Sequence, residues 1–277
     1  MENASSIYEL INSQPIGIPV FHEIALRLQQ MMCDNRYRIE EVIKLINEDT
    51  ALSATMLKHA NSTYNTGKAA ITTIKDAIVR LGSQQVVNLA FTASMSDSKS
   101  NNAVINCCMK LLWRHSYRTA IISSWLAVEL NQEKLVKNIN ADEVYLAGRL
   151  HDIGKLYLLK AMDRLAEDGS IHVDKIMINE MANQYGSGLG ARVLRHWNIP
   201  DLYVDVVERH CALQWNTGVN DHMVAAVRLS SRLCDYMEDD NELTADSSVF
   251  NLLGDELEML RISDVEYLSS IVHAVTD

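Results

Sequence analysis

The sequence predicts a protein built almost entirely of α-helices. Its 277 residues include only 3 prolines and 11 glycines. So few turn-forming residues favour long helices over the many tight turns of sandwiches and barrels. Hydrophobic residues make up 48% of the chain, which is enough for a sizeable core. At this length, one large domain and two closely packed lobes are both compatible with the chain.

The N-terminal third carries the spacing of short amphipathic helices. Apolar residues recur at i, i+3, i+4 and i+7 within residues 39–46 and again within residues 74–81. Gly82 directly follows the second pattern and is predicted to end that helix. Pro15 and Pro19 are predicted to flank a loop that precedes these helices.

Longer helices are predicted beyond a polar stretch, SDSKSNN, at residues 96–102. This stretch is the best candidate for a boundary, and it divides the chain into an N-terminal helical lobe at 1–100 and a second helical lobe with a helical tail at 101–277. A long helical pattern then runs from Val104 to Leu130. Asn140, with Glu143 three residues later, predicts the capped start of the next helix.

Charge and composition exclude several classes of partner. The formal net charge of −11 argues against a nucleic-acid-binding protein, because such proteins need clustered Lys and Arg to neutralise phosphates. No apolar run approaches the roughly 18 residues that would span a membrane, and the first segment does not resemble a signal peptide. The five cysteines show no C-x-x-C spacing, as expected of reduced thiols. We therefore expect a cytoplasmic protein with neither nucleic acid nor membrane as a partner.

The sequence LHDIGKL at residues 150–156 is the most informative stretch for function. It holds the pair His151–Asp152, which Gly154 and Lys155 follow after one intervening residue. His115, on an earlier predicted helix, supplies a second imidazole. Imidazole nitrogen and carboxylate oxygen together suit divalent transition metals, and a nearby lysine can hold a phosphate group. The motif predicts metal-dependent phosphate-ester chemistry, or its remnant.

Several motifs, in the same order along the chain, resemble those of the HDOD family. They are QPIGIP at 14–19, EDTALSATMLKHANS at 48–62, ITTIKDAIVRLG at 71–82, LHDIGKL at 150–156, GLGARVLRHWNIP at 188–200 and VVERHC at 206–211. The resemblance covers residues 14–235 and implies a multi-helix, HD-like architecture in which an N-terminal helical lobe packs on an HD-like helical lobe. It also implies kinship with HD-superfamily phosphohydrolases and with cyclic-dinucleotide phosphodiesterases that carry an HD-GYP motif. HDOD domains themselves generally serve as regulatory modules that have lost the metal site, so the resemblance alone does not assign an activity.

The resemblance places metal ligands of the active HD enzymes on His115, His151 and Asp152. The position of their distant aspartate corresponds to Ser231, and Asp235 lies about one helical turn further along the chain. A serine hydroxyl is a poor substitute for a carboxylate ligand. The metal shell is therefore predicted to be incomplete.

The HD-GYP relatives use further histidines for a second metal, and these positions also differ here. One of them corresponds to Gly186, and the paired histidines correspond to His210–Cys211. Asn61–Ser62 is the characteristic pair of the family. We predict that it forms a helix end and turn beside the cleft rather than a catalytic dyad, because Ser62 has no base near it in the sequence.

Three functions remain open: a non-catalytic signalling module, a metal-dependent enzyme, and a redox or nucleotide sensor. The favoured interpretation is a non-catalytic module of bacterial signal transduction that binds a signalling protein or a small ligand and needs no cofactor. In that case His151 and Asp152 form a hydrogen-bonded pair buried between helices.

The alternative is a metal-dependent phosphohydrolase or cyclic-dinucleotide phosphodiesterase with a weakly bound divalent metal, namely Mn, Fe, Mg or Zn. Lys155 would then orient the phosphate group while the metal activates water. The ligands in that interpretation are His115, His151 and Asp152, with His210 and Asp235 as supplementary ligands.

Overall fold

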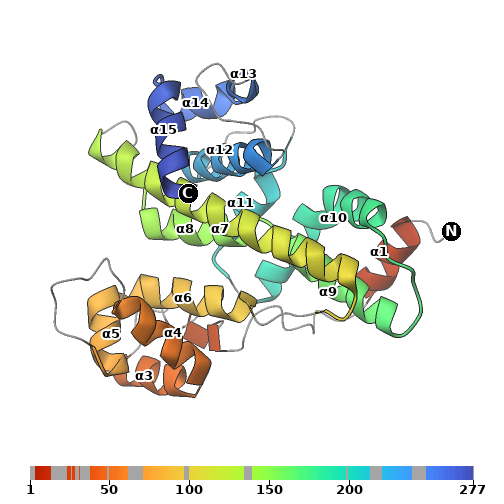
Figure 1. Ribbon diagram of the computed structural model, residues 1–277, viewed down its shortest axis with the longest axis horizontal. Helices are drawn as coiled ribbons and strands as arrows, with labels where there is room; N and C mark the ends of the chain where they lie inside the picture. The colour runs from red at the N-terminus through yellow and green to blue at the C-terminus, as the bar shows by residue number, and fades with distance from the viewer. Residues whose placement is uncertain are drawn as a thin grey trace. The chain divides into compact units, whose positions relative to one another are not determined.

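In the computed structural model, the described residues are 4–13, 24–25, 27–28, 31, 38–48, 50–61, 71–96, 100–133, 139–197, 199–212, 220–238 and 248–276. These ranges contain helices and turns but no β-strand, which confirms the predicted all-α class. Figure 1 shows the helices. In chain order they are α1 (Ala4–Ser13), α3 (Ile39–Asn47), α4 (Thr50–Ala60), α5 (Ile74–Leu81), α6 (Ser83–Ser96), α7 (Ala103–Gln132), α8 (Ala141–Leu150), α9 (Ile153–Glu167), α10 (Lys175–His196), α11 (Asp201–Arg209), α12 (Asp221–Glu238), α13 (Val249–Leu252), α14 (Gly254–Leu260) and α15 (Val265–Thr276).

The structure confirms the helix limits that the sequence predicted. Helices α3 and α5 occupy the two periodic segments, and α7 covers the long helical pattern. Gly82 ends α5 with a φ of 80°, a conformation that glycine adopts without the steric cost of a side chain. The side chain of Asn140 accepts hydrogen bonds from the backbone N–H groups of Asp142 and Glu143 and so caps α8. The loop predicted around Pro15 and Pro19 lies outside the described residues.

The chain forms two compact units. The smaller contains residues 19–99 and 197–199, and the larger contains residues 1–18, 100–196 and 200–277. The segment that carries α1 therefore groups with the larger unit, whereas the predicted division had placed it in the N-terminal lobe. The packing of one lobe on the other stays a prediction.

In the smaller unit, α4 packs against α3, α5 and α6. The buried side chains of Ala60, Ile71 and Ala77 form a cluster there. Asn61 closes this cluster, because its amide donates to the carbonyl of Ile71 and its amide oxygen accepts from the N–H of Ile71, each over 2.8 Å. This pair of hydrogen bonds joins the end of α4 to the start of the segment that leads into α5.

In the larger unit, α7 is the central helix. Helices α8, α9 and α12 pack along it, and α10 packs against α9 and α11 (Figure 1). The buried face of α7 carries His115 and Thr119 as well as apolar residues, so this helix brings polar groups into the core.

Glycines allow α9 to approach α10 closely. A Cβ atom on Gly154 would lie 1.9 Å from the carbonyl oxygen of Gly186 and 2.5 Å from the backbone nitrogen of Gly190. Backbone atoms cannot move aside as a flexible side chain can. The crossing therefore requires glycine at position 154, two residues beyond Asp152.

A buried ion pair attaches the C-terminal helices to the rest of the larger unit. Arg228 on α12 donates from Nε to Glu256 on α14 over 2.7 Å, and both side chains are nearly inaccessible to solvent. The same guanidinium donates from Nη1 to the carbonyl oxygens of Arg209 and Ala212. This contact fixes the turn at the end of α11.

In the part of the chain that the structure describes, no helix is both long enough and apolar enough to cross a bilayer.

We expect Gly154→Ala to destabilise the protein by at least about 3 kcal/mol, because overpacking against backbone exceeds the usual cost of an extra methyl group. Gly188→Ala is the matched control on α10, since a Cβ atom there would meet nothing within 4 Å. The control should gain up to about 1 kcal/mol, as expected for alanine in an exposed helix. Urea unfolding of both variants measures the difference, and equal stabilities would contradict the proposed crossing.

Candidate functional site

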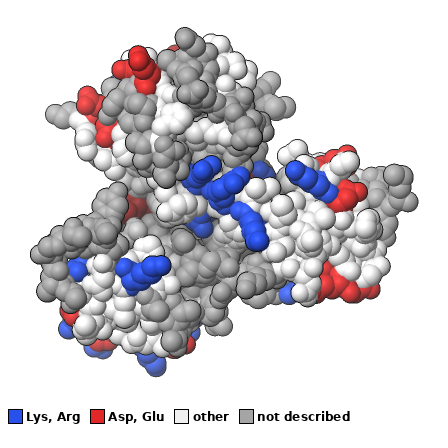
Figure 2. Space-filling view, viewed as in Figure 1, with Lys and Arg blue, Asp and Glu red and all other residues white. Residues whose placement is uncertain are grey.

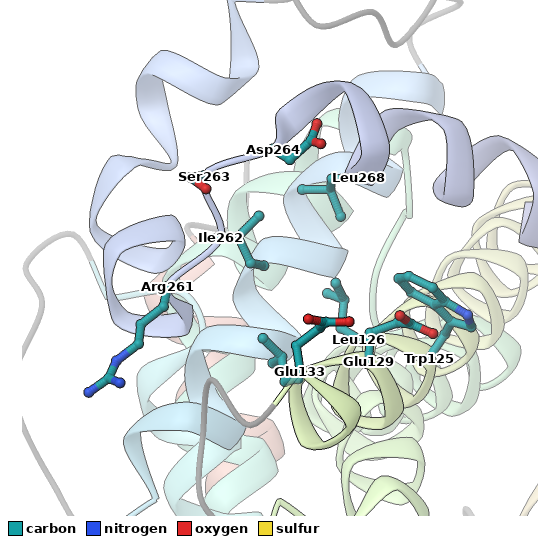
Figure 3. A pocket seen from close by; sticks show the side chains of 10 residues that line it. Trp125, Leu126, Glu129, Glu133, Arg261, Ile262, Ser263, Asp264 and Leu268 are labelled. Carbon is teal, nitrogen blue, oxygen red and sulfur yellow. The ribbon is translucent and has the colours of Figure 1, made fainter.

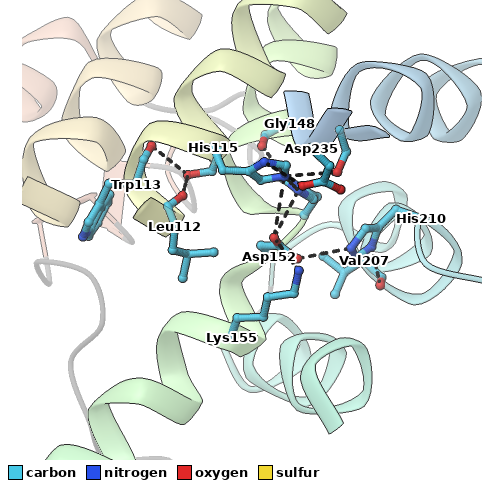
Figure 4. A network of polar contacts seen from close by, with 12 residues as sticks. Leu112, Trp113, His115, Gly148, Asp152, Lys155, Val207, His210 and Asp235 are labelled. Carbon is cyan, nitrogen blue, oxygen red and sulfur yellow. Dashed lines mark hydrogen bonds and ion pairs between the residues drawn. The ribbon is translucent and has the colours of Figure 1, made fainter. Parts of the chain in front are cut away.

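The His–Asp pair lies where α8 ends and α9 begins. His151 is the C-cap residue directly after α8, and Asp152 is the N-cap residue directly before α9. The chain bends at this point, so both side chains turn into the larger unit, where they are 1% and 5% exposed. The N-terminal end of α9 favours the negative charge of Asp152. Figure 4 shows the polar network around them.

Three of the predicted ligands converge. The Nε2 atoms of His115 and His151 lie 3.3 Å apart, and Oδ2 of Asp152 lies 3.4 Å from the second and 3.9 Å from the first. Donor atoms around a tetrahedral metal with bonds of about 2.1 Å lie about 3.4 Å from one another. Two of the three separations fit that geometry, and all three atoms lie within 4.8 Å of one another.

Hydrogen bonding defines the protonation of His151. Its Nδ1 lies 2.7 Å from the carbonyl oxygen of Gly148 and donates to it. Burial, which disfavours the charged ring, lowers the pKa of His151 to about 4 although Asp152 opposes the shift. The ring is therefore neutral near pH 7 and presents an unprotonated Nε2 to the cluster, as metal binding requires.

Asp152 is held between two cations. Lys155 donates from Nζ to Oδ2 over 2.8 Å, and Nε2 of His210 lies 3.3 Å from Oδ1 (Figure 4). Burial alone would raise the pKa of this carboxyl, but Lys155 and the neighbouring histidines outweigh burial and hold it well below its usual range. The same contact raises the pKa of Lys155, again against the effect of burial. Asp152 is therefore an anion and Lys155 a cation at physiological pH.

His210 is the second cation. Its Nδ1 lies 2.9 Å from the carbonyl oxygen of Val207, and its Nε2 faces Asp152. Only a doubly protonated ring donates at both ends. Burial favours the neutral ring, but the hydrogen bonds to Asp152 and Cys211 prevail and raise the pKa of His210 to about 9. The structure thus places His210 against the carboxylate rather than among the converging ligand atoms.

Helix α12 supplies Ser231 and Asp235. The hydroxyl oxygen of Ser231 lies 3.1 Å from Nε2 of His115 and 3.5 Å from Nε2 of His151, so it faces the cluster. Asp235 approaches the opposite side of the His115 ring, where its Oδ1 lies 3.3 Å from Nδ1. A carboxylate at the remote nitrogen of a ligating histidine orients the ring instead of binding the metal. Asp235 therefore lies at the remote nitrogen of His115, outside the converging ligand atoms.

Gly186 leaves space for the stem of Lys155. A Cβ atom at this position would lie 3.2 Å from Cγ of Lys155. A larger side chain there would compete with the lysine for this space. Because position 186 has no side chain, Lys155 has room to contact Asp152.

An open cleft of about 230 Å³ lies beside the cluster. His115, Asp152, Lys155 and Asp235 reach it, and Leu111, Leu112, Leu159 and Ile178 form apolar walls. Lys175, at the start of α10, adds a second ammonium group. Nothing in the sequence singled out Lys175, because a lone lysine at a helix start has no distinguishing pattern. The cleft offers two ammonium groups, two carboxylates and apolar surface together.

A second cavity of about 340 Å³ lies away from the cluster, between the end of α7 and the loop that joins α14 to α15 (Figure 3). Trp125, Glu129, Glu133 and Asp264 line it, and the side chain of Arg261 extends away from the others. None of the predicted site residues reaches this cavity.

Asn61 belongs to the smaller unit, where its contacts with Ile71 are structural. Ser62 lies outside the described residues. The predicted position of this pair beside the cleft stays a prediction.

The fold and the site define a helical protein of HD type, with a histidine, a His–Asp pair and a cleft beside them. The HDOD domain family matches residues 18–213, and the chain belongs to this family. Helix α12, which carries Ser231 and Asp235, lies beyond the matched residues.

Three solved structures share the fold. The "Putative metal-dependent phosphohydrolase" from Shewanella amazonensis SB2B is 20% identical, covers 99% of this chain and 98% of its own, and has a TM-score of 0.72. An HDOD domain protein with unknown function from Geobacter sulfurreducens is 22% identical over 98% of this chain and 92% of its own, with a TM-score of 0.66. The "Putative signal transduction protein" from Marinobacter aquaeolei VT8 is 17% identical, over 99% of this chain and 66% of its own, with a TM-score of 0.60.

An uncharacterized protein of Treponema pallidum (strain Nichols) is 23% identical over 213 residues. The matched part is 75% of this chain but only 39% of that relative. The chain therefore spans less than half the length of this curated relative.

We expect the metal-free protein to be most stable near pH 6.5. The pKa of His210 is raised to about 9, so its contribution is complete below 6.5 and is lost as the pH rises through 9. The pKa of His151 is lowered to about 4, so the folded protein loses stability as the pH falls from 6.5 towards 4. Urea unfolding in EDTA across this range measures both effects.

His210→Gln should flatten the alkaline limb of this profile, and His151→Gln should flatten the acidic limb. His172→Gln is the matched control, since this histidine is exposed. A profile in which the control variant changes the limbs as much as the buried-site variants do would contradict these protonation states.

Proposed function

We propose that this protein is a non-catalytic regulatory module of bacterial signalling that binds a small ligand or a protein partner at the cleft beside His151 and Asp152. One observation carries the proposal. Where a fourth metal ligand would be needed, the cluster presents the neutral hydroxyl of Ser231, which lies 3.1 Å from Nε2 of His115.

The charges around Asp152 support the same conclusion. Lys155 bonds the carboxylate oxygen that a metal would need, and His210 bonds the other oxygen. Two cations already neutralise this carboxylate, and they would repel a divalent ion nearby. Each oxygen of the buried carboxylate therefore has a partner without a metal, which supports the non-catalytic proposal.

A metal-dependent phosphohydrolase is the second candidate, because three donor atoms converge within 4.8 Å. His115, His151 and Asp152 would hold the ion, which would polarise a phosphoryl oxygen and activate water. Lys155 would lie beside the phosphate group in the cleft. Two imidazoles and one carboxylate suit Zn, Mn or Fe, but Ser231 provides no negative charge to complete the set.

The role of Ser231 can be tested by restoring a carboxylate. We expect Ser231→Asp to bind Mn²⁺ about 10–100-fold more tightly than the wild type, since even outer-shell changes alter metal affinity by that much. Ser231→Asn is the matched control, because it has the same size without the charge. Isothermal titration calorimetry gives the affinities. Tight stoichiometric binding by the wild type would overturn the proposal of an incomplete shell.

Catalysis is tested by Asp152→Asn. We expect wild type and variant alike to hydrolyse bis-p-nitrophenyl phosphate in Mn²⁺ at background rates. The variant should be less stable by about 1.5–3 kcal/mol, because the charged partner of Lys155 and His210 is lost. Asp142→Asn is the control, since this aspartate is exposed in the first turn of α8. Substantial wild-type turnover that disappears in Asp152→Asn would establish the enzyme instead.

A further inference from the structure

The solvent-facing side of α7 combines positive charge with exposed apolar surface. Lys110, Arg114 and Arg118 follow one another at intervals of four residues, and α7 has no acidic residue before Glu129. Lys110 and Arg114 are exposed, and Arg118 is half-buried. In the view of Figure 2, Lys and Arg side chains gather over this helix. Such a concentration is unusual in a chain with a net charge of −11.

Apolar groups accompany these cations on the same side of the helix. Tyr117 is 47% exposed, and Ile121 continues the same line along the helix. Residues seven and eleven positions after Lys110 share its face of a helix. We call Lys110, Arg114, Tyr117, Arg118 and Ile121 the α7 ridge. Among the described residues, half of the exposed large apolar side chains are on α7.

We infer that the α7 ridge is a docking surface for an acidic amphipathic helix of a partner protein. Cations four residues apart on a helix are separated by about 6 Å along its axis, which is also the spacing of Glu side chains at i and i+4 on a second helix. Exposed ion pairs contribute little each, so the charges would set orientation and register. Tyr117 and Ile121 would supply the apolar contact on which affinity depends.

The shape of the charge favours a protein helix over other anionic partners. Proteins that bind nucleic acid cover several phosphates with a wide group of cations, and membrane-binding segments carry about four to eight of them. The ridge is a single line of cations accompanied by apolar residues. This inference goes beyond the proposed function, because none of the ridge residues lines the cleft.

The probe for this surface is a fluorescent helical peptide with Glu at every fourth position and Leu three residues after each Glu, in an alanine background. Its partner probe carries Gln in place of Glu. In fluorescence anisotropy, we expect the full chain to bind the Glu peptide at least about tenfold more tightly than the Gln peptide, with the difference reduced by salt.

The triple variant Lys110→Glu, Arg114→Glu and Arg118→Glu should weaken Glu-peptide binding at least about tenfold. The triple variant with Gln at the same positions removes the charges without reversing them and so controls for misfolding of the Glu variant. A melting curve shows whether each of the two variants is folded. Tyr117→Ser should weaken binding without changing its salt dependence, because it removes no charge.

The matched control is Lys44→Glu, Lys58→Glu and Lys75→Glu, which changes the net charge equally at exposed sites of the smaller unit. It should alter binding less than about twofold. An equal loss in the control, or equal binding of both peptides, would overturn the inference. Ridge-dependent binding of duplex DNA or phosphatidylserine vesicles, without binding of the Glu peptide, would also overturn it.

Discussion

The buried carboxylate of Asp152 is the group on which the rest of the site depends. It is bonded by Lys155 at one oxygen and by His210 at the other. Taking such a charge out of water is unfavourable unless each of its oxygens has a partner. Three helices meet this requirement together, because Asp152 lies between α8 and α9, α9 carries Lys155 and His210 directly follows α11.

Two details of the backbone make this arrangement possible. Gly154 lets α9 approach α10 closely enough for its first turn to enter the core. Gly186 then leaves room for the stem of Lys155, so that the ammonium group reaches the carboxylate from the side of α10. The glycine of the LHDIGKL motif thus serves packing, and the chemistry of its neighbours depends on that packing.

Much of the fold could be predicted from the sequence, because helix spacing and capping are local. The periodic segments at 39–46 and 74–81, the stop at Gly82 and the cap at Asn140 all depend on residues within about two turns. The convergence of His115, His151 and Asp152 was implied by the family resemblance, and the structure brings these residues together.

Other features could not be predicted from the sequence, because they depend on contacts between distant segments. Asp235 was predicted as a supplementary ligand, but which nitrogen of His115 it approaches depends on the rotation of α12, and the structure shows Nδ1. The α7 ridge was also not predicted from the sequence, because its cations are four residues apart and form no run in the sequence.

The buried contacts of Arg228 bear on how much of the chain is needed to hold the site in place. The residues that match the family end at 213, yet Arg228 and its partner Glu256 lie beyond them. Arg228 donates to the carbonyl oxygens of Arg209 and Ala212, on either side of His210. The matched domain is therefore shorter than the piece of chain that holds the turn at His210 in place. Homologues with different C-terminal helices would share the motif but hold this turn with different rigidity, so variation outside the domain could tune the site without changing any of its residues.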